Sequence, residues 1–189
     1  MQGKSLEHKK YKVGGIIMIK KLWVYEDFSK VYKMFRGSPY FENWTDELLM
    51  EEYNFLNEKG VMYGKYIDDN IVGMVSYLPY KVDEHNIVLP ENKKIGYLAD
   101  IAVLNEYRKR GIGTEMFTYV VNKLISEKYD YLYFRTVING SMSEGIGKKL
   151  GFEIVYDDSG NLVTQEISFP RNRPDIPEKE SRKFLLKKI

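Results

Sequence analysis

Residues 96–137 contain the pattern that most restricts how this chain can fold. Gly96–Leu104 is an apolar run in which Asp100 is the only charge, which is typical of a buried strand. Thr114–Lys128 carries apolar residues at the spacing of one helix face, and Tyr131–Val137 is a second strand-like run. A strand, a helix and a strand in this order form a crossover unit. The pattern therefore predicts an α/β domain.

The rest of the chain supplies hairpins and helices around this unit. We expect further strands at Ile16–Leu22, Val61–Ile67, Ile71–Leu78, directly after Gly151, and at Leu162–Phe169 behind a turn at Asp157–Asn161. We expect further helices at Tyr25–Phe35, Thr45–Gly60, Ser141–Leu150 and, at the end of the chain, Glu178–Lys188. Hairpins in the first half and crossovers in the second predict a mixed central sheet flanked by helices, within an α/β (α+β) fold.

The chain of 189 residues is long enough for one core, so we expect one domain with two short appendages. Residues 1–15 are polar and basic and form the expected N-terminal extension, with Met18 as an alternative start of the folded unit. Residues 16–170 form the expected domain, and residues 171–189 a C-terminal extension packed on it. No apolar run approaches the roughly 18 residues of a transmembrane helix, which predicts a cytoplasmic protein without membrane contact.

Composition excludes several kinds of chemistry. The chain has no cysteine, which excludes a disulfide framework, a Cys-ligated metal site and a cysteine nucleophile. Its only histidines are His8 and His85, so a multi-histidine metal centre is not expected. The 29 basic and 27 acidic residues give a net charge of +2, which is too even to indicate a nucleic-acid partner.

The turn between the buried strand and the amphipathic helix has the features of an anion site. A helix start offers unpaired backbone N–H groups, and glycines let a phosphate approach the backbone. Three cations precede the glycines, so a diphosphate is the expected ligand. A solvated surface turn whose glycines serve only turn geometry is the alternative. The residues of this loop are Arg108, Lys109, Arg110, Gly111, Ile112, Gly113 and Thr114.

This loop resembles the acyl-CoA pyrophosphate loop of the GNAT superfamily of N-acetyltransferases, whose pattern is Arg/Gln-x-x-Gly-x-Gly/Ala. The preceding strand and the Asn105-Glu106-Tyr107 that follows it are similar to the family's fourth strand and its usual Pro-Glu-Tyr. Tyr131–Val137 followed by Lys148–Phe152 is similar to the family's later motif, a strand and a short helix that ends in Gly-Phe. The two motifs occur in the family's order and spacing.

The resemblance implies acetyl-CoA as cofactor and assigns residues to it. A bulge in the family's fourth strand separates it from the fifth, and the pantetheine arm lies between them. Lys109–Thr114 would hold the pyrophosphate. Ile101, Ala102 and Val103 would contact the arm, although packing under a helix also explains Ala102. Asn139 follows the fifth strand, where many members bond the arm, but Asn139-Gly140 is also a strong turn dipeptide.

The reaction needs a proton acceptor for the amine and a proton donor for the thiolate. Burial would raise the pKa of Asp100 towards a useful value, which makes it the expected base, with a structural carboxylate as the alternative. The family's usual acid is a tyrosine, but its position here falls on Ile146 or Gly147. Tyr133 is the substitute we expect, unless water protonates the thiolate. We expect Glu106 and His85 to be surface side chains.

The leading interpretation is an enzyme that transfers acetyl directly to a small-molecule or peptide amine, and a homodimer is compatible with it. An acyl-CoA-binding sensor of the same fold is one alternative. An RNA- or protein-interaction domain that uses the basic turn is another. Aromatic residues are expected near the acceptor site as lid or core packing: Tyr40, Phe41, Trp44 and Tyr80.

Overall fold

The computed structural model describes residues 17–33, 45–139, 141–168 and 179–189. The predicted extension at 1–15 lies outside these ranges, as do residues 171–178 of the predicted C-terminal extension. The expected aromatic residues Tyr40, Phe41 and Trp44 also lie outside them, whereas Tyr80 is described and is 38% exposed.

One mixed sheet organises the molecule, in the order β1-β2-β3-β4-β5-β8-β6 with β7 also beside β8. Only β4 and β5 run parallel; the other neighbouring pairs are antiparallel. The strands are β1 Ile17–Lys21, β2 Val61–Ile67, β3 Asn70–Leu78, β4 Ile95–Val103, β5 Tyr131–Val137, β6 Glu153–Ile154, β7 Thr164–Ser168 and β8 Lys179–Lys188. The predicted mixed sheet and its first hairpin are confirmed.

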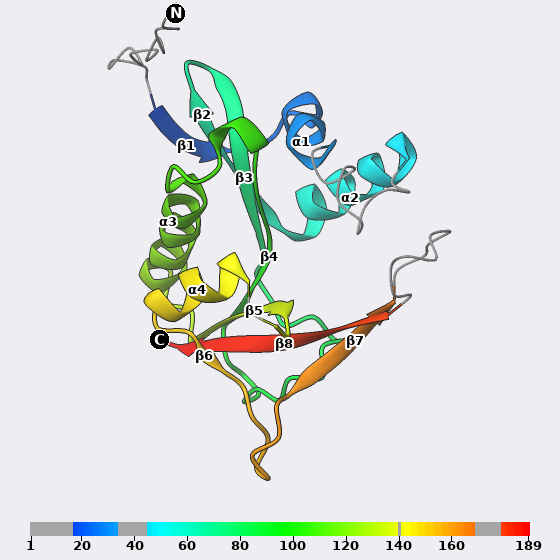
Figure 1. Cartoon of the computed structure of the whole chain (residues 1–189), viewed down its shortest axis with the longest axis vertical. Helices are drawn as coiled ribbons and strands as arrows, with labels where there is room; N and C mark the ends of the chain where they lie inside the picture. The colour runs from blue at the N-terminus through cyan, green and yellow to red at the C-terminus, as the bar shows by residue number, and fades with distance from the viewer. Residues whose placement is uncertain (1–16, 34–44, 140, 169–178) are drawn as a thin grey trace, which may run out of the picture.

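Helices cover both faces of the sheet, with α1 and α2 on one side and α3 and α4 on the other (Figure 1). Each pair buries its own core: Phe28 and Leu49 belong to the first, Met116 and Ile146 to the second. Thr45 caps α2 as predicted, because its side chain accepts a hydrogen bond from the Leu48 N–H. The helices are α1 Tyr25–Tyr32, α2 Asp46–Lys59, α3 Ile112–Ser126 and α4 Met142–Lys149. In the described part of the chain, no helix is long and apolar enough to cross a membrane.

The predicted terminal helix at Glu178–Lys188 is wrong, because Lys179–Lys188 forms strand β8. Its lysines, glutamates and leucines have good helix propensity, which suggested a helix. However, β8 bonds to β5 along one edge and to β6 and β7 along the other. Phe184 and Leu185 in its middle are fully buried, one against each core. Sheet pairing and burial on both faces therefore override the local preference.

Strands β4 and β5 pair only at their beginnings. Their register joins three residue pairs, the last of which is Tyr97 and Tyr133, and the strands then continue without pairing to each other. The register between β3 and β4 shifts here, because Ser76 faces Asp100 whereas Tyr77 faces Leu98. Ala99 is thus an extra residue, and such a bulge bends a strand and increases its twist. We call the two segments that do not pair with each other, 98–103 of β4 and 134–137 of β5, the strand opening.

Candidate active site

The strand opening and the start of α3 lie next to each other. A Cβ added at Gly113 would lie 3.7 Å from a Val103 methyl and 3.8 Å from the Ile101 side chain. The predicted pyrophosphate loop and the predicted arm-binding strand are therefore one continuous surface. Buried Lys65 of β2 forms an ion pair with Glu115 in the first turn of α3, which fixes this helix end on the sheet.

The start of α3 has the backbone of an anion site. Gly111 is the N-cap residue in the left-handed region, at φ 79°, and no side chain caps the helix. A Cβ there would meet nothing within 4 Å, so backbone conformation rather than crowding requires glycine. The first bond back into the turn is from the Glu115 N–H to the Gly111 carbonyl, at 2.9 Å. The N–H groups of residues 112–114 precede it and are the ones a helix leaves for an anion.

The three cations of the loop are exposed, but two of them also shape it. Arg108 Nε donates to the Val103 carbonyl at 3.1 Å, and Arg110 donates to the Glu106 carbonyl at 2.7 Å. The Arg110 guanidinium also lies 5.2 Å from the centre of the Tyr107 ring. Glu106 is exposed, as predicted. The donor set of helix N–H groups with exposed cations fits a diphosphate.

Asp100 lies in the strand opening with hydroxyl groups around its carboxyl. Ser76 Oγ donates to Oδ2 at 3.1 Å and accepts the Asp100 N–H at 3.2 Å. Tyr32 of α1 also bonds to this carboxyl. Burial raises the pKa of Asp100, and these hydrogen bonds and the positive charge of Arg135 oppose that rise. The environment expected of a base and that of a structural carboxylate are thus both present.

Glu52 is a site residue that sequence reasoning did not assign. It lies on the face of α2 that also carries buried Leu49 and Leu56, three residues before and four after it. Burial, and then the negative charge of Asp100, raises the pKa of Glu52 to about 7. No ion pair involves Glu52 within the described ranges. A glutamate on the core-facing side of an amphipathic helix was the signal that could have identified it.

Arg135 of β5 connects Tyr97 of β4 to strand β7. Its Nε donates to the Tyr97 hydroxyl at 3.3 Å, and its Nη1 donates to the side-chain oxygen of Gln165 on β7 at 3.2 Å. Gln165 in turn donates to the Glu84 carbonyl in the loop between β3 and β4, at 2.9 Å. Arg135 therefore brings a fixed positive charge close to Tyr97 and Asp100. Neither Arg135 nor Tyr97 stood out in the sequence.

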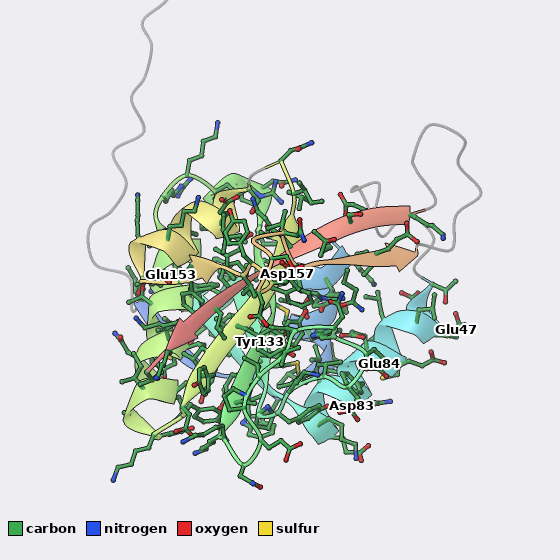
Figure 2. All side chains as sticks on the ribbon, turned by 90° about the horizontal axis from the view of Figure 1, so that it is seen from below. Glu47, Asp83, Glu84, Tyr133, Glu153 and Asp157 are labelled. Carbon is green, nitrogen blue, oxygen red and sulfur yellow. The ribbon has the colours of Figure 1, made fainter. Side chains whose placement is uncertain are left out.

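Tyr133 lies inside the protein rather than on the surface of the strand opening. Its ring has no exposed area, and Figure 2 shows it in the middle of the molecule while Glu47 lies at the margin. Its hydroxyl accepts the Val82 N–H at 3.0 Å and lies 2.9 Å from His85 Nδ1. Burial raises the pKa of Tyr133 above its ordinary value.

The expectation that His85 is a solvated loop residue is wrong, because its side chain is 4% exposed. The ring packs edge-on against Tyr97, with centres 4.6 Å apart, and against Tyr133 and Phe184. Burial, followed by the charges of Arg135 and Lys81, lowers the pKa of His85 to about 3. His85 is therefore neutral at physiological pH, and its Nδ1 can accept the Tyr133 O–H.

The turn after β5 and helix α4 complete the surroundings. Asn139 is exposed just beyond the end of β5, as a cofactor contact or a turn residue would be. Ile146 and Gly147 are buried in α4, so neither position presents a hydroxyl. A Cβ at Gly147 would lie 2.5 Å from the Phe134 ring, which explains why even a small side chain is absent there.

The comparisons with known proteins identify the family to which this fold belongs. The model of the acetyltransferase (GNAT) family matches residues 24–152, which is more than half of the chain. The chain therefore belongs to the GNAT acetyltransferase family.

Two relatives and one solved structure show how far the similarity reaches. The Drosophila melanogaster protein named probable N-acetyltransferase san and the Danio rerio N-alpha-acetyltransferase 50 are each 33% identical to it over 93 residues. These matches cover 48% of this chain and 45% and 49% of the relatives, so the chain spans about half the length of the curated relatives it matches. Arabidopsis thaliana NAA60, solved with a bisubstrate analogue, has a TM-score of 0.68 at 13% identity. That match covers 92% of this chain and 98% of the other, and it shows the shared fold.

Proposed function

We propose that this protein is an acetyl-CoA-dependent N-acetyltransferase that moves acetyl directly to a primary amine. The observation that carries the proposal is the strand opening placed against an uncapped helix start with glycine at 111 and 113. The helix start offers backbone N–H groups for a diphosphate. The strand opening offers the strand edges that β4 and β5 do not use for each other to an amide-bearing arm. The Arabidopsis neighbour, which shares the fold, was solved with a bisubstrate analogue, and this supports a site that holds two substrates together.

The residues of the chain would hold the cofactor in three places. The N–H groups at 112–114, with Arg108, Lys109 and Arg110, would bind the diphosphate. The backbone of Ile101, Ala102 and Val103 would bind the arm, and an N–H of this strand would polarise the thioester carbonyl. Asn139 would bond the arm from the β5 side. When bound, acetyl-CoA would supply an acetyl group activated as a thioester.

Asp100 and Glu52 would remove the proton from the acceptor ammonium. Their carboxyls influence each other, and Glu52 has a pKa of about 7, so the pair can accept a proton near neutral pH. A free amine can then attack the carbonyl without a covalent enzyme intermediate. Holding both reactants in line supplies much of the rate. A thiolate then leaves, and it needs a proton from the enzyme or from water.

For that proton we propose a phenol at the start of the strand opening. Tyr133 is one candidate, although its hydroxyl is engaged by Val82 and His85. Tyr97, its partner in register, is the other, because its hydroxyl contacts Arg135 and its ring lies 4.9 Å from that of Tyr133. The names of the relatives favour a peptide α-amine as the acceptor to test before small amines.

Calorimetric titration with acetyl-CoA, CoA and ATP tests the cofactor assignment. Gly113→Glu should abolish binding, because it places a carboxylate among the phosphate-binding N–H groups. It should still fold, because its Cβ would make only ordinary contacts and a glutamate suits the first turn of a helix. Gly145→Glu is the matched control, since it adds the same side chain to α4 where a Cβ meets nothing within 4 Å. Wild-type protein that binds neither CoA species would refute the proposal.

A catalytically weak acyl-CoA-binding module is the second candidate. The buried Ile146 and Gly147 at the usual position of the acid favour it. Turnover with a panel of peptide and small amines separates the two functions. Loss of a wild-type activity in Asp100→Asn supports the enzyme. Tight acetyl-CoA binding without turnover of any amine supports the binding module.

A further inference from the structure

Two lysines of β8 hold the two ends of helix α4. Lys183 Nζ donates to the Ile138 carbonyl at 2.8 Å and lies 2.9 Å from Glu144 Oε2 in the first turn of α4. Lys187 Nζ donates to the Leu150 carbonyl at the other end of α4, also at 2.8 Å. The two contacts use the same side chain and the same kind of acceptor, four residues apart on one strand.

The environment of Lys183 is built rather than incidental. Its side chain is 7% exposed, and that of Glu144 is 10% exposed. Burying an ammonium is costly unless oxygen acceptors surround it, and here a carboxylate and a carbonyl do so. Hydroxyl groups of Thr136, Ser141 and Ser143 bond to one another, and Ser141 also caps α4. The end of β5 and the beginning of α4 are therefore fixed as one unit.

The sheet register places the two lysines at different distances from the strand opening. Lys187 pairs with Leu132, where β5 is still bonded to β4. Lys183 pairs with Thr136, where β5 has left β4. Only Lys183 therefore supports the part of β5 that borders the opening. Its carbonyl partner, Ile138, immediately precedes Asn139.

We propose that Lys183 is a positioning residue for the acyl-CoA cofactor: from the terminal strand it holds Ile138 and the start of α4, so that Asn139 faces the strand opening. The inference rests on the proposed function, because it needs a cofactor in that opening. The inference goes beyond the proposed function because it gives strand β8 a part in cofactor affinity. Lys187 makes an equivalent bond away from the opening and should have no such part.

Paired variants on β8 test this inference. Lys183→Met and Lys187→Met each remove one lysine–carbonyl bond, and thermal melting should show that both lower stability. In calorimetric titration, Lys183→Met should weaken acetyl-CoA binding by about tenfold, because the loss of one well-placed hydrogen bond changes a dissociation constant by a factor of that order. Lys187→Met should leave affinity unchanged. Lys183→Arg keeps the charge and should recover part of the affinity.

The outcomes separate this inference from the proposed function. Wild-type protein that fails to bind acetyl-CoA overturns both. Wild-type protein that binds, with Lys183→Met and Lys187→Met indistinguishable in affinity, overturns only the role of Lys183. If Lys183→Met does not fold, Lys183→Arg decides, because it keeps a positive charge beside Glu144 and changes the bond to the Ile138 carbonyl. Lys183→Arg should then bind acetyl-CoA more weakly than wild type, and an unchanged affinity would overturn the inference.

Discussion

Replacing Glu52 by glutamine should stabilise the protein at alkaline pH and leave its stability almost unchanged at pH 4. The pKa of Glu52 is about 7 in the folded protein, against an ordinary value of 4.5. Below pH 4.5 the carboxyl is protonated in both states, so the variant and the wild type are alike. Between pH 4.5 and 7 the unfolded chain ionises first, so the wild type loses stability as pH rises through this window. Above pH 7 the loss is complete.

The magnitude follows from the size of this difference. The two values differ by about 2.5 pH units, and each unit corresponds to 1.36 kcal/mol, which gives about 3 kcal/mol. Part of the Glu52 side chain is accessible, and solvent reduces the effect, so we expect about 2 kcal/mol at pH 8. Asp100→Asn should narrow the pH range over which Glu52 affects stability, because the charge of Asp100 is the second cause of the raised pKa of Glu52.

Urea denaturation of wild type and Glu52→Gln at pH 4, 6 and 8 measures the effect. Comparing the two proteins at each pH cancels the titration of groups that do not interact with Glu52. Glu51→Gln is the matched control, because it removes a carboxylate from an exposed position of the same helix. A stability difference that does not change with pH would refute the reasoning. If Glu52 also accepts the substrate proton, the stabler variant should be the slower enzyme at neutral pH.

Three further predictions concern the interior. Gly147→Ala should lower the free energy of unfolding by about 1–3 kcal/mol, because its Cβ would lie 2.5 Å from the Phe134 ring. Denaturant unfolding measures this loss. Gly145→Ala is the control and should be at least as stable as wild type. His85→Gln should lose less stability than wild type as pH falls from 6.5 towards 3. The reason is that the pKa of His85 is about 3 in the folded protein, so the unfolded chain takes up the proton first. Equal slopes of unfolding free energy against pH for the two proteins would contradict this. Tyr133→Phe should lower the free energy of unfolding by about 1–2 kcal/mol, because it leaves the Val82 N–H without its acceptor. It should reduce kcat less than Tyr97→Phe does, and the reverse order would assign the acid to Tyr133.

Sequence patterns predicted the elements whose signal is local. Three elements could be predicted because hydrophobic period and turn residues depend on neighbouring positions. They are the buried strand with one charge, the helix after Gly113 and the hairpin of Val61–Ile67 and Ile71–Leu78. The helix at residues 179–188 was wrong for the opposite reason. A strand that bonds on both edges receives its stability from distant partners, and local propensity does not contain them.

The site shows the same division between local and distant information. The loop that ends at Gly113 could be read directly, because its features follow one another in the chain. The Glu52–Asp100 pair depends on where α2 packs against the sheet. The Arg135–Tyr97 contact depends on where β4 and β5 separate. His85 was misjudged because a loop position predicts exposure, whereas here the loop folds back over the aromatic rings beside β5.

The place of β8 in the sheet has a consequence for how the chain folds as it is made. Strands β6 and β7 are synthesised before β8, yet within the described residues both join the sheet only through β8. Until residues 179–188 leave the ribosome, one edge of β5 stays open and those two strands have no partner. Folding of this half therefore waits for contacts between residues far apart in sequence, which form slowly. A nascent chain paused before residue 179 should leave the β5 edge that β8 covers accessible to chaperones.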